Sequence, residues 1–170
     1  MVNGERDNGL ERAFGLATGL SAFFAITPFL YAGIVEYLSW NQAPFAGFAP
    51  GINLALFLPL LALVGLTEIA LSWWMPGRIL SGKVPAAPMG PQSAWSGSVQ
   101  RLFQANLVAF SILGSIAVYG LMLFLVGGHR WHFYAFASVS LVLMLARFPR
   151  RILWDEALSG MTENDRGVQP

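Results

Sequence analysis

Four long apolar stretches, separated by short polar ones, constrain this chain of 170 residues more than any other feature of its sequence. They cover residues 13–38, 51–74, 102–126 and 131–149. A helix needs about 20 mostly apolar residues to cross the hydrocarbon core of a bilayer, which is about 30 Å thick. The sequence therefore predicts an all-α membrane protein, a bundle of four transmembrane helices within residues 13–154.

The composition agrees with a membrane location and excludes several classes of function. Hydrophobic residues make up 55% of the chain and charged residues only 11%, against about 25% charged in soluble domains. The net charge of +1 provides no basic surface for nucleic acid. Because the chain has no cysteine, it forms no disulfide and ligates no iron–sulfur cluster. The expected partners are membrane lipids and other membrane protein subunits.

The basic residues predict the orientation of the chain. Nine of its ten lysines and arginines lie in the N-terminal segment 1–12, between the second and third spans, or at and after the end of the fourth. Arg130 alone falls on the opposite side. Because cytoplasmic loops are rich in lysine and arginine, we expect both termini, including the tail 155–170, to be cytoplasmic. The expected location is the inner membrane of a bacterium.

Aromatic side chains gather near the expected ends of the spans, as they do at membrane interfaces. The outer set is Tyr37, Trp40, Trp131 and Tyr134, and the inner set is Trp73, Trp74, Trp95 and Trp154. We therefore expect both sets to lie at the level of the lipid headgroups.

Pro28 and Pro59 lie inside the first and second spans, where a soluble helix would break. Each frees a backbone carbonyl, which a neighbouring helix or a hydroxyl such as that of Thr27 can satisfy in a membrane. The long apolar surroundings favour bent but continuous spans at both positions.

The two halves of the chain resemble each other where their second spans end. The segment 76–80 (PGRIL) matches the segment 149–153 (PRRIL) at four of five positions. This similarity favours two tandem helical hairpins. The alternative is that a basic residue beside a proline is a common way for spans to end at the inner interface.

Glu68 is the most costly residue in the apolar stretches, because a carboxylate in hydrocarbon must be paired, protonated or hydrated. Counting about 1.5 Å per residue from Gly51 places it nearer the inner interface than the midplane. The expected partner is an arginine at an inner helix end: Arg12, Arg101 or Arg147. A role in binding a proton, an ion or a ligand is the alternative.

Two further positions are candidates for binding near the outer ends of the spans. Glu36 is expected at the interface, and a functional role would require Arg130 or His132 as its partner. His129 and His132 are spaced i, i+3 and can share a helix face, as metal and haem ligands do. Two histidines at one boundary are too few to hold a metal ion or a haem between helices, so we expect a pair of hydrogen-bonded histidines at the interface. A pigment or haem bound to His132 is the alternative.

Small residues predict where helices approach closely. Gly15 and Gly19 form a GxxxG motif in the first span, and Gly114 and Ser115 lie in the third. We expect these faces to pack within the four-helix bundle. Packing against another chain is the alternative.

Together these patterns favour a non-catalytic accessory subunit that packs within a larger membrane protein complex. The centres of the four spans hold no ionisable group, although an ion-coupled carrier normally needs one there. The chain also lacks the enzyme signatures G-x-S-x-G, H-E-x-x-H and the P-loop. The alternative is a small oligomeric channel or transporter with Glu68 at its inner end.

Overall fold

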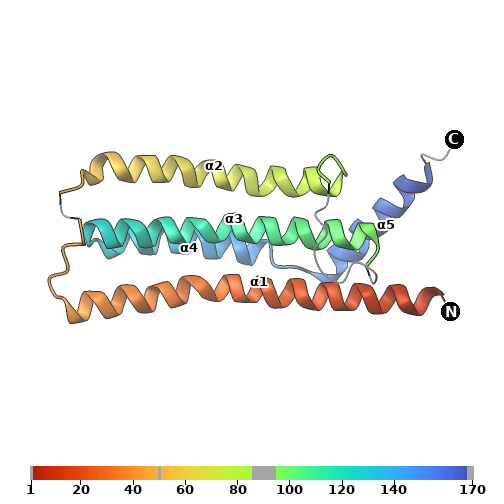
Figure 1. Cartoon of the computed structure of the whole chain (residues 1–170), viewed down its shortest axis with the longest axis horizontal. Coiled ribbons are helices and arrows are strands. Elements are labelled where there is room, and N and C mark those ends of the chain that lie inside the picture. The colour runs from red at the N-terminus through yellow and green to blue at the C-terminus, as the bar shows by residue number, and fades with distance from the viewer. Residues whose placement is uncertain (1, 50, 86–94, 168–170) are drawn as a thin grey trace. The chain divides into compact units, whose positions relative to one another are not determined.

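The computed structural model describes residues 2–49, 51–85 and 95–167, and the side chains of residues 9–49, 51–85 and 95–160. In this part of the chain there are five helices and no strand (Figure 1). The helices are α1 (Val2–Asn41), α2 (Leu54–Leu80), α3 (Gly97–Gly127), α4 (Arg130–Ala146) and α5 (Arg151–Gly167). The prediction of an all-helical protein is confirmed.

Three of these helices are long and apolar enough to cross a membrane: Gly9–Asn41 of α1, all of α2 and all of α3. A fourth span is reached only when α4 and the Arg151–Gly160 part of α5 are taken together as one bent pair. The reason is the length of α4, whose 17 residues extend only about 26 Å at 1.5 Å per residue. The described chain therefore has three candidate spans, or up to four.

The helices extend beyond the apolar stretches that predicted them. α1 begins at Val2 rather than near residue 13, and α2 continues past residue 74 to Leu80. Residues 86–94 of the loop between α2 and α3 lie outside the described part of the chain.

α5 is a helix where the sequence indicated only a polar tail. Trp154, Ala157 and Leu158 recur at helical spacing and pack against apolar side chains, whereas Asp155 and Glu156 stay exposed. One apolar face can stabilise a short helix by packing against the rest of the protein, because tertiary packing supplies most of the stability of such helices.

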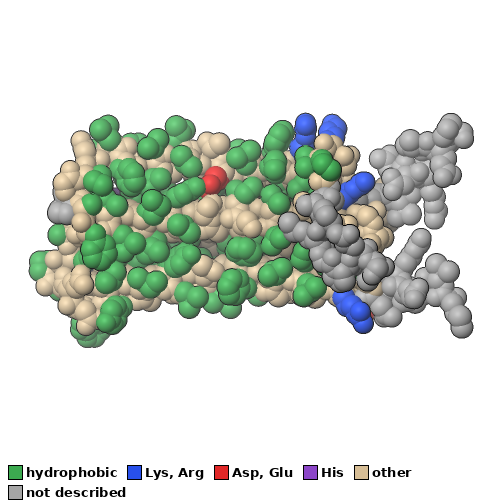
Figure 2. Space-filling model, viewed as in Figure 1, with side chains coloured by type: hydrophobic (Ala, Val, Ile, Leu, Met, Phe, Trp, Pro, Cys, Tyr) green, Lys and Arg blue, Asp and Glu red, His purple; other side chains and the backbone are tan. Residues whose placement is uncertain are grey.

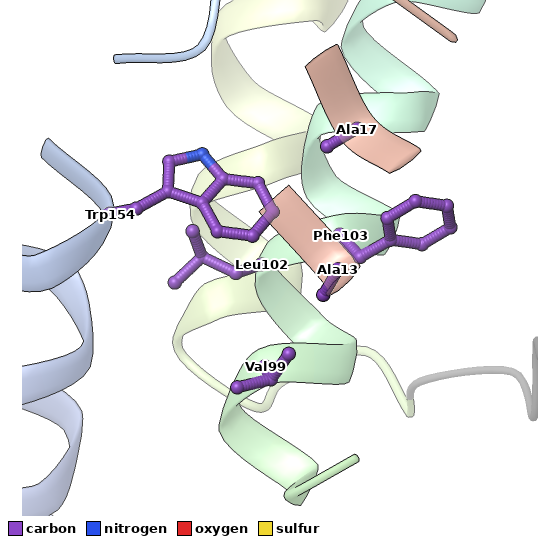
Figure 3. Packing of buried hydrophobic residues seen from close by; sticks show 6 residues of the cluster. All are labelled: Ala13, Ala17, Val99, Leu102, Phe103 and Trp154. Carbon is purple, nitrogen blue, oxygen red and sulfur yellow. The ribbon is translucent and has the colours of Figure 1, made fainter. Parts of the chain in front are cut away.

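Contacts divide the chain into two compact units. Unit 1 consists of Met1–Ser21, Trp73–Ala109 and Phe148–Pro170. Its core, drawn in Figure 3, brings together Ala13 and Ala17 of α1, Val99, Leu102 and Phe103 of α3, and Trp154 of α5. The Trp154 indole lies with its ring centroid 5.5 Å from that of Phe14, edge to face. Trp154 is only 5% exposed, so its indole packs within unit 1.

Unit 2 consists of Ala22–Ser72 and Phe110–Arg147. Within it, α3 runs between α1 and α2 (Figure 1), and α4 packs against α3. The Ser140 hydroxyl of α4 donates a 2.6 Å hydrogen bond to the Leu113 carbonyl of α3. A Cβ on Gly120 of α3 would come within 2.8 Å of Phe136 of α4, so the two helices are in close contact there. The α3–α4 pair thus forms the centre of this unit.

The loop after α1 is hydrogen-bonded to the C-terminal end of α3 and packs closely against it. The amide of Phe48 donates a 2.7 Å hydrogen bond to the Leu125 carbonyl. Gly128 has a φ of 71°, and a Cβ there would lie 2.3 Å from the Phe45 carbonyl oxygen. Glycine is needed at this position for both its backbone conformation and its lack of a side chain.

The prolines lie within continuous helices, as the apolar context predicted. α1 continues through Pro28, and α2 continues through Pro59. The Thr27 hydroxyl, however, donates to the Phe23 carbonyl, 3.1 Å away, rather than to the carbonyl four residues before Pro28. The suggested role of Thr27 in satisfying that freed carbonyl is therefore wrong.

The two similar segments differ in backbone conformation. The segment 76–80 lies inside α2, whereas Pro149 lies in the break between α4 and α5. The resemblance in sequence therefore does not extend to the same local structure.

Exposed apolar side chains dominate α1 and α2. Figure 2 shows hydrophobic groups over much of the visible surface of these helices, interrupted by red carboxylate atoms. On α2, the side chains of Leu56, Leu60, Leu63 and Leu66 are each more than half exposed. Such a surface suits contact with lipid or with the apolar surface of another membrane protein.

Candidate functional site

Glu68 lies near the middle of the 27 residues of α2, within unit 2. Ser115 and Tyr119 are four residues apart on α3, so they share one face of that helix. Ser115 Oγ lies 2.6 Å from Glu68 Oε2, and Tyr119 Oη lies 2.5 Å from Glu68 Oε1. Each carboxyl oxygen thus has a hydroxyl partner, and the pair of hydrogen bonds joins α2 to α3. We call these three residues the Glu68 cluster.

The partners of Glu68 are hydroxyl groups rather than the arginine that the sequence led us to expect. Arg147 donates instead to the backbone carbonyl of Ser72 on α2. Arg101 lies beside Gly82, and Arg12 is exposed. The carboxyl group is only partly buried. The structure therefore replaces the expected ion pair with hydrogen bonds to uncharged donors.

Glu36 near the end of α1 has two partners on α4. Tyr134 donates a hydrogen bond to Glu36 Oε1, and Arg130 Nη1 lies 3.9 Å from Glu36 Oε2. This supplies the Arg130 partner that a functional role for Glu36 required. The Arg130 and Glu36 side chains are 55% and 52% exposed, however, so their ion pair contributes at most about 1 kcal/mol.

His132 lies on α4 between Arg130 and Tyr134. Its ring centroid is 5.6 Å from that of His129, in an edge-to-face arrangement. Its Nδ1 atom is buried and has no hydrogen-bond partner in the part of the chain that the structure describes. Among those residues, no group of three or more histidine and acidic side chains is placed to hold a metal ion. A role for His132 as a ligand to a pigment or haem stays a prediction.

The small residues singled out in the sequence have different surroundings. A Cβ on Gly114 would lie 3.5 Å from both Met144 and Phe24, so α3 does pack closely there. Gly15 and Gly19, by contrast, are exposed, and within the described part of the chain no atom lies within 4 Å of an added Cβ at either position. Close packing of this GxxxG face is therefore not found among the described residues. Ser115 serves as a hydrogen-bond partner of Glu68 rather than as a bare packing surface.

Several polar contacts of the spans were missed from the sequence. Asn106 of α3 donates a 2.9 Å hydrogen bond to Ser21 of α1, within unit 1. Tyr119 was missed as a partner of Glu68, although its spacing from Ser115 places both hydroxyls on one helix face. Spacing within one helix gives such a shared face, but it does not give the helix that the face meets.

Comparison of the chain with protein-family models, with curated proteins and with solved structures found no match.

Proposed function

We propose that the chain is a non-catalytic subunit of a larger membrane protein complex. In this proposal it crosses the inner membrane of a bacterium as a bundle of four spans, with both termini in the cytoplasm. The fourth span is the bent α4–α5 pair, and the excess of arginine and lysine in the cytoplasmic segments sets the orientation.

The observation that carries this proposal is the open glycine face of α1. Gly15 and Gly19 are one turn apart, and no atom of the described residues lies within 4 Å of an added Cβ at either position. Each glycine lowers the stability of a helix by about 1 kcal/mol relative to alanine. An exposed pair of glycines therefore destabilises α1 without allowing closer packing inside the chain. In membranes such pairs let the backbones of two helices approach closely. A helix of another subunit would supply the missing contact.

The polar groups of the spans support a structural rather than a catalytic role. The side chains of Glu68, Asn106 and Ser140 each form a hydrogen bond with a neighbouring helix of the same chain. Such contacts hold helices together in a medium that offers no water. The exposed leucines of α2 are suited to lipid.

The proposal is tested by isolating the full chain from native membranes in a mild detergent and determining the mass and composition of the particle. We expect other membrane proteins at fixed stoichiometry. A particle that contains this chain alone would contradict the proposal.

A second candidate is a small oligomeric channel or transporter with Glu68 at its inner end. The partial exposure of the Glu68 carboxyl group favours it, because an acidic side chain at a pore can select cations. In this case the isolated particle would be a homo-oligomer, and vesicles containing it would show a cation flux that Glu68→Gln abolishes.

A further inference from the structure

The turn that ends α2 brings two cationic residues together. The amide of Gly82 donates to the Ile79 carbonyl and the amide of Lys83 donates to the Arg78 carbonyl, each over 3.1 Å. Gly82 has a φ of 71°, so these two hydrogen bonds form a Schellman motif, in which a glycine in the left-handed conformation ends the helix. The motif places the backbone of Lys83 beside that of Arg78, and both residues are exposed.

Arg101, near the start of α3, adds a third cation at the same turn. The position of a Cβ on Gly82 would lie 3.2 Å from Arg101 Nη1 and 3.5 Å from Arg101 Cζ, so the guanidinium group packs against this glycine. Figure 2 shows lysine and arginine side chains, in blue, around this end of α2. We call Arg78, Lys83 and Arg101 the basic cluster, and all three residues belong to unit 1.

The basic cluster has no counter-ion from its own part of the chain. Residues 69–154 contain no aspartate or glutamate, so neither α3 nor the loop before it supplies a carboxylate. Among the side chains that the structure describes, none of the three cations forms an ion pair, whereas Glu11 of unit 1 pairs with Arg151. Like charges that converge on one turn repel one another unless an anion lies between them. The cluster is therefore suited to an anionic ligand.

Trp74 places one of these cations beside an apolar surface. Arg78 Cζ lies over the Trp74 ring, 5.0 Å from its centroid, which is a cation–π contact. A guanidinium group held in this way keeps its N–H donors, whose fork matches two oxygens of a phosphate. Trp73 and Trp74 are 59% and 55% exposed, and tryptophan is enriched at the level of lipid headgroups. Phosphate-binding and apolar groups thus adjoin each other at this end of α2.

We infer that the basic cluster binds the phosphate of an anionic phospholipid at the C-terminal end of α2. The guanidinium groups of Arg78 and Arg101 bind phosphate oxygens, and Lys83 adds a third positive charge. The exposed indoles favour a lipid over a free anion, because they offer the acyl chains an apolar surface that inorganic phosphate does not use. This goes beyond the proposed subunit role, because it assigns a ligand to the turn after the second span.

Lipid binding to the full chain in a neutral detergent tests the inference. Native mass spectrometry measures which lipid stays bound when phosphatidylglycerol and phosphatidylcholine are added in equal amounts. We expect the wild type to retain phosphatidylglycerol preferentially. Arg78→Gln combined with Arg101→Gln should weaken this binding about 30-fold, at about fivefold for each basic residue near a membrane surface.

The matched control is Arg12→Gln combined with Arg150→Gln, which removes the same charge from two exposed arginines of unit 1. This variant should bind phosphatidylglycerol as the wild type does. Equal losses in the two double variants would show a general effect of charge and would overturn the inference. Equal retention of the two lipids by the wild type would overturn it as well.

A charge-preserving variant separates binding from folding. Arg78→Lys combined with Arg101→Lys should keep the preference for phosphatidylglycerol but bind it more weakly than the wild type, because an ammonium group does not bind phosphate in a bidentate way. A loss as large as that in the glutamine variant would contradict the inference. Inorganic phosphate at the same concentration should leave the bound lipid in place, and displacement of the lipid would overturn its assignment as the ligand.

Discussion

The guanidinium group of Arg147 donates a hydrogen bond to the backbone carbonyl of Ser72, one turn before Pro76 in α2. In an uninterrupted helix this carbonyl would accept from the amide of residue 76, but proline has no amide proton. Arg147, at the C-terminal end of α4, therefore replaces a bond that the sequence of α2 has removed. The contact joins α4 to α2 within unit 2.

Replacing Arg147 should cost more stability while Pro76 is present than after Pro76 has been replaced. We expect Arg147→Met to lower the free energy of unfolding by about 1.5–3 kcal/mol, the range for a hydrogen bond to a charged group. In a Pro76→Ala background the loss should be smaller, because the restored amide satisfies the Ser72 carbonyl. Denaturation in detergent measures both, with Arg150→Met at an exposed arginine as the control. Equal losses in the two backgrounds would refute the compensation.

Two glycine-to-alanine changes separate close packing from open surface. Gly120→Ala should lower the free energy of unfolding by about 1–3 kcal/mol, since its Cβ would lie 2.8 Å from Phe136 and 3.0 Å from the Phe133 carbonyl oxygen. An added Cβ at Gly33 meets none of the described atoms within 4 Å, so Gly33→Ala should leave stability unchanged or raise it. Melting of the purified variants gives the comparison. Equal tolerance of the two changes would contradict the described contact of α3 with α4.

Trp154 should determine whether α5 stays docked. Trp154→Ala removes a side chain that is 5% exposed, a change that costs about 3–5 kcal/mol in a packed core. We expect faster proteolytic cleavage between residues 147 and 167. Ile152→Ala, at a side chain that is 72% exposed, is the matched control and should leave the cleavage rate unchanged.

The cysteine-free chain allows a direct measurement of orientation. A cysteine at Ala46 should react with a membrane-impermeant reagent added to intact cells, whereas one at Ser159 should react only after the membrane is opened. Both positions are exposed, so accessibility within the chain does not limit the reaction. Gly128 is unsuitable for this test because its Cβ would collide with the Phe45 carbonyl. Labelling of Ser159 in intact cells would reverse the assigned orientation.

The apolar stretches predicted the helices well because hydrophobic length is a local property of the sequence. The helical state of α1, α2, α3 and α4 followed from it, whereas the break between α4 and α5 near Arg147 was not predicted. α5 could not be predicted in the same way, since its stability comes from the contact of Trp154 with Phe14 and Leu102, which are far away in the sequence.

The candidate site was predicted only in part. Glu68 was identified because an acidic residue in an apolar stretch is costly wherever it lies. Its partners were not, because the choice between an arginine and the hydroxyls of Ser115 and Tyr119 depends on which helix α2 meets and on the rotation of that helix. For the same reason, Gly15 and Gly114 have similar sequence surroundings but only Gly114 is packed.

Crosslinking from the glycine face of α1 tests the subunit proposal most directly. A photoreactive residue placed at Gly19 should give one adduct with a different membrane protein in native membranes. The same residue at Leu63 of α2, which is 62% exposed, should give lipid adducts. Lipid adducts alone at Gly19 would contradict the proposal, and an adduct between two copies of this chain would favour the oligomeric channel instead.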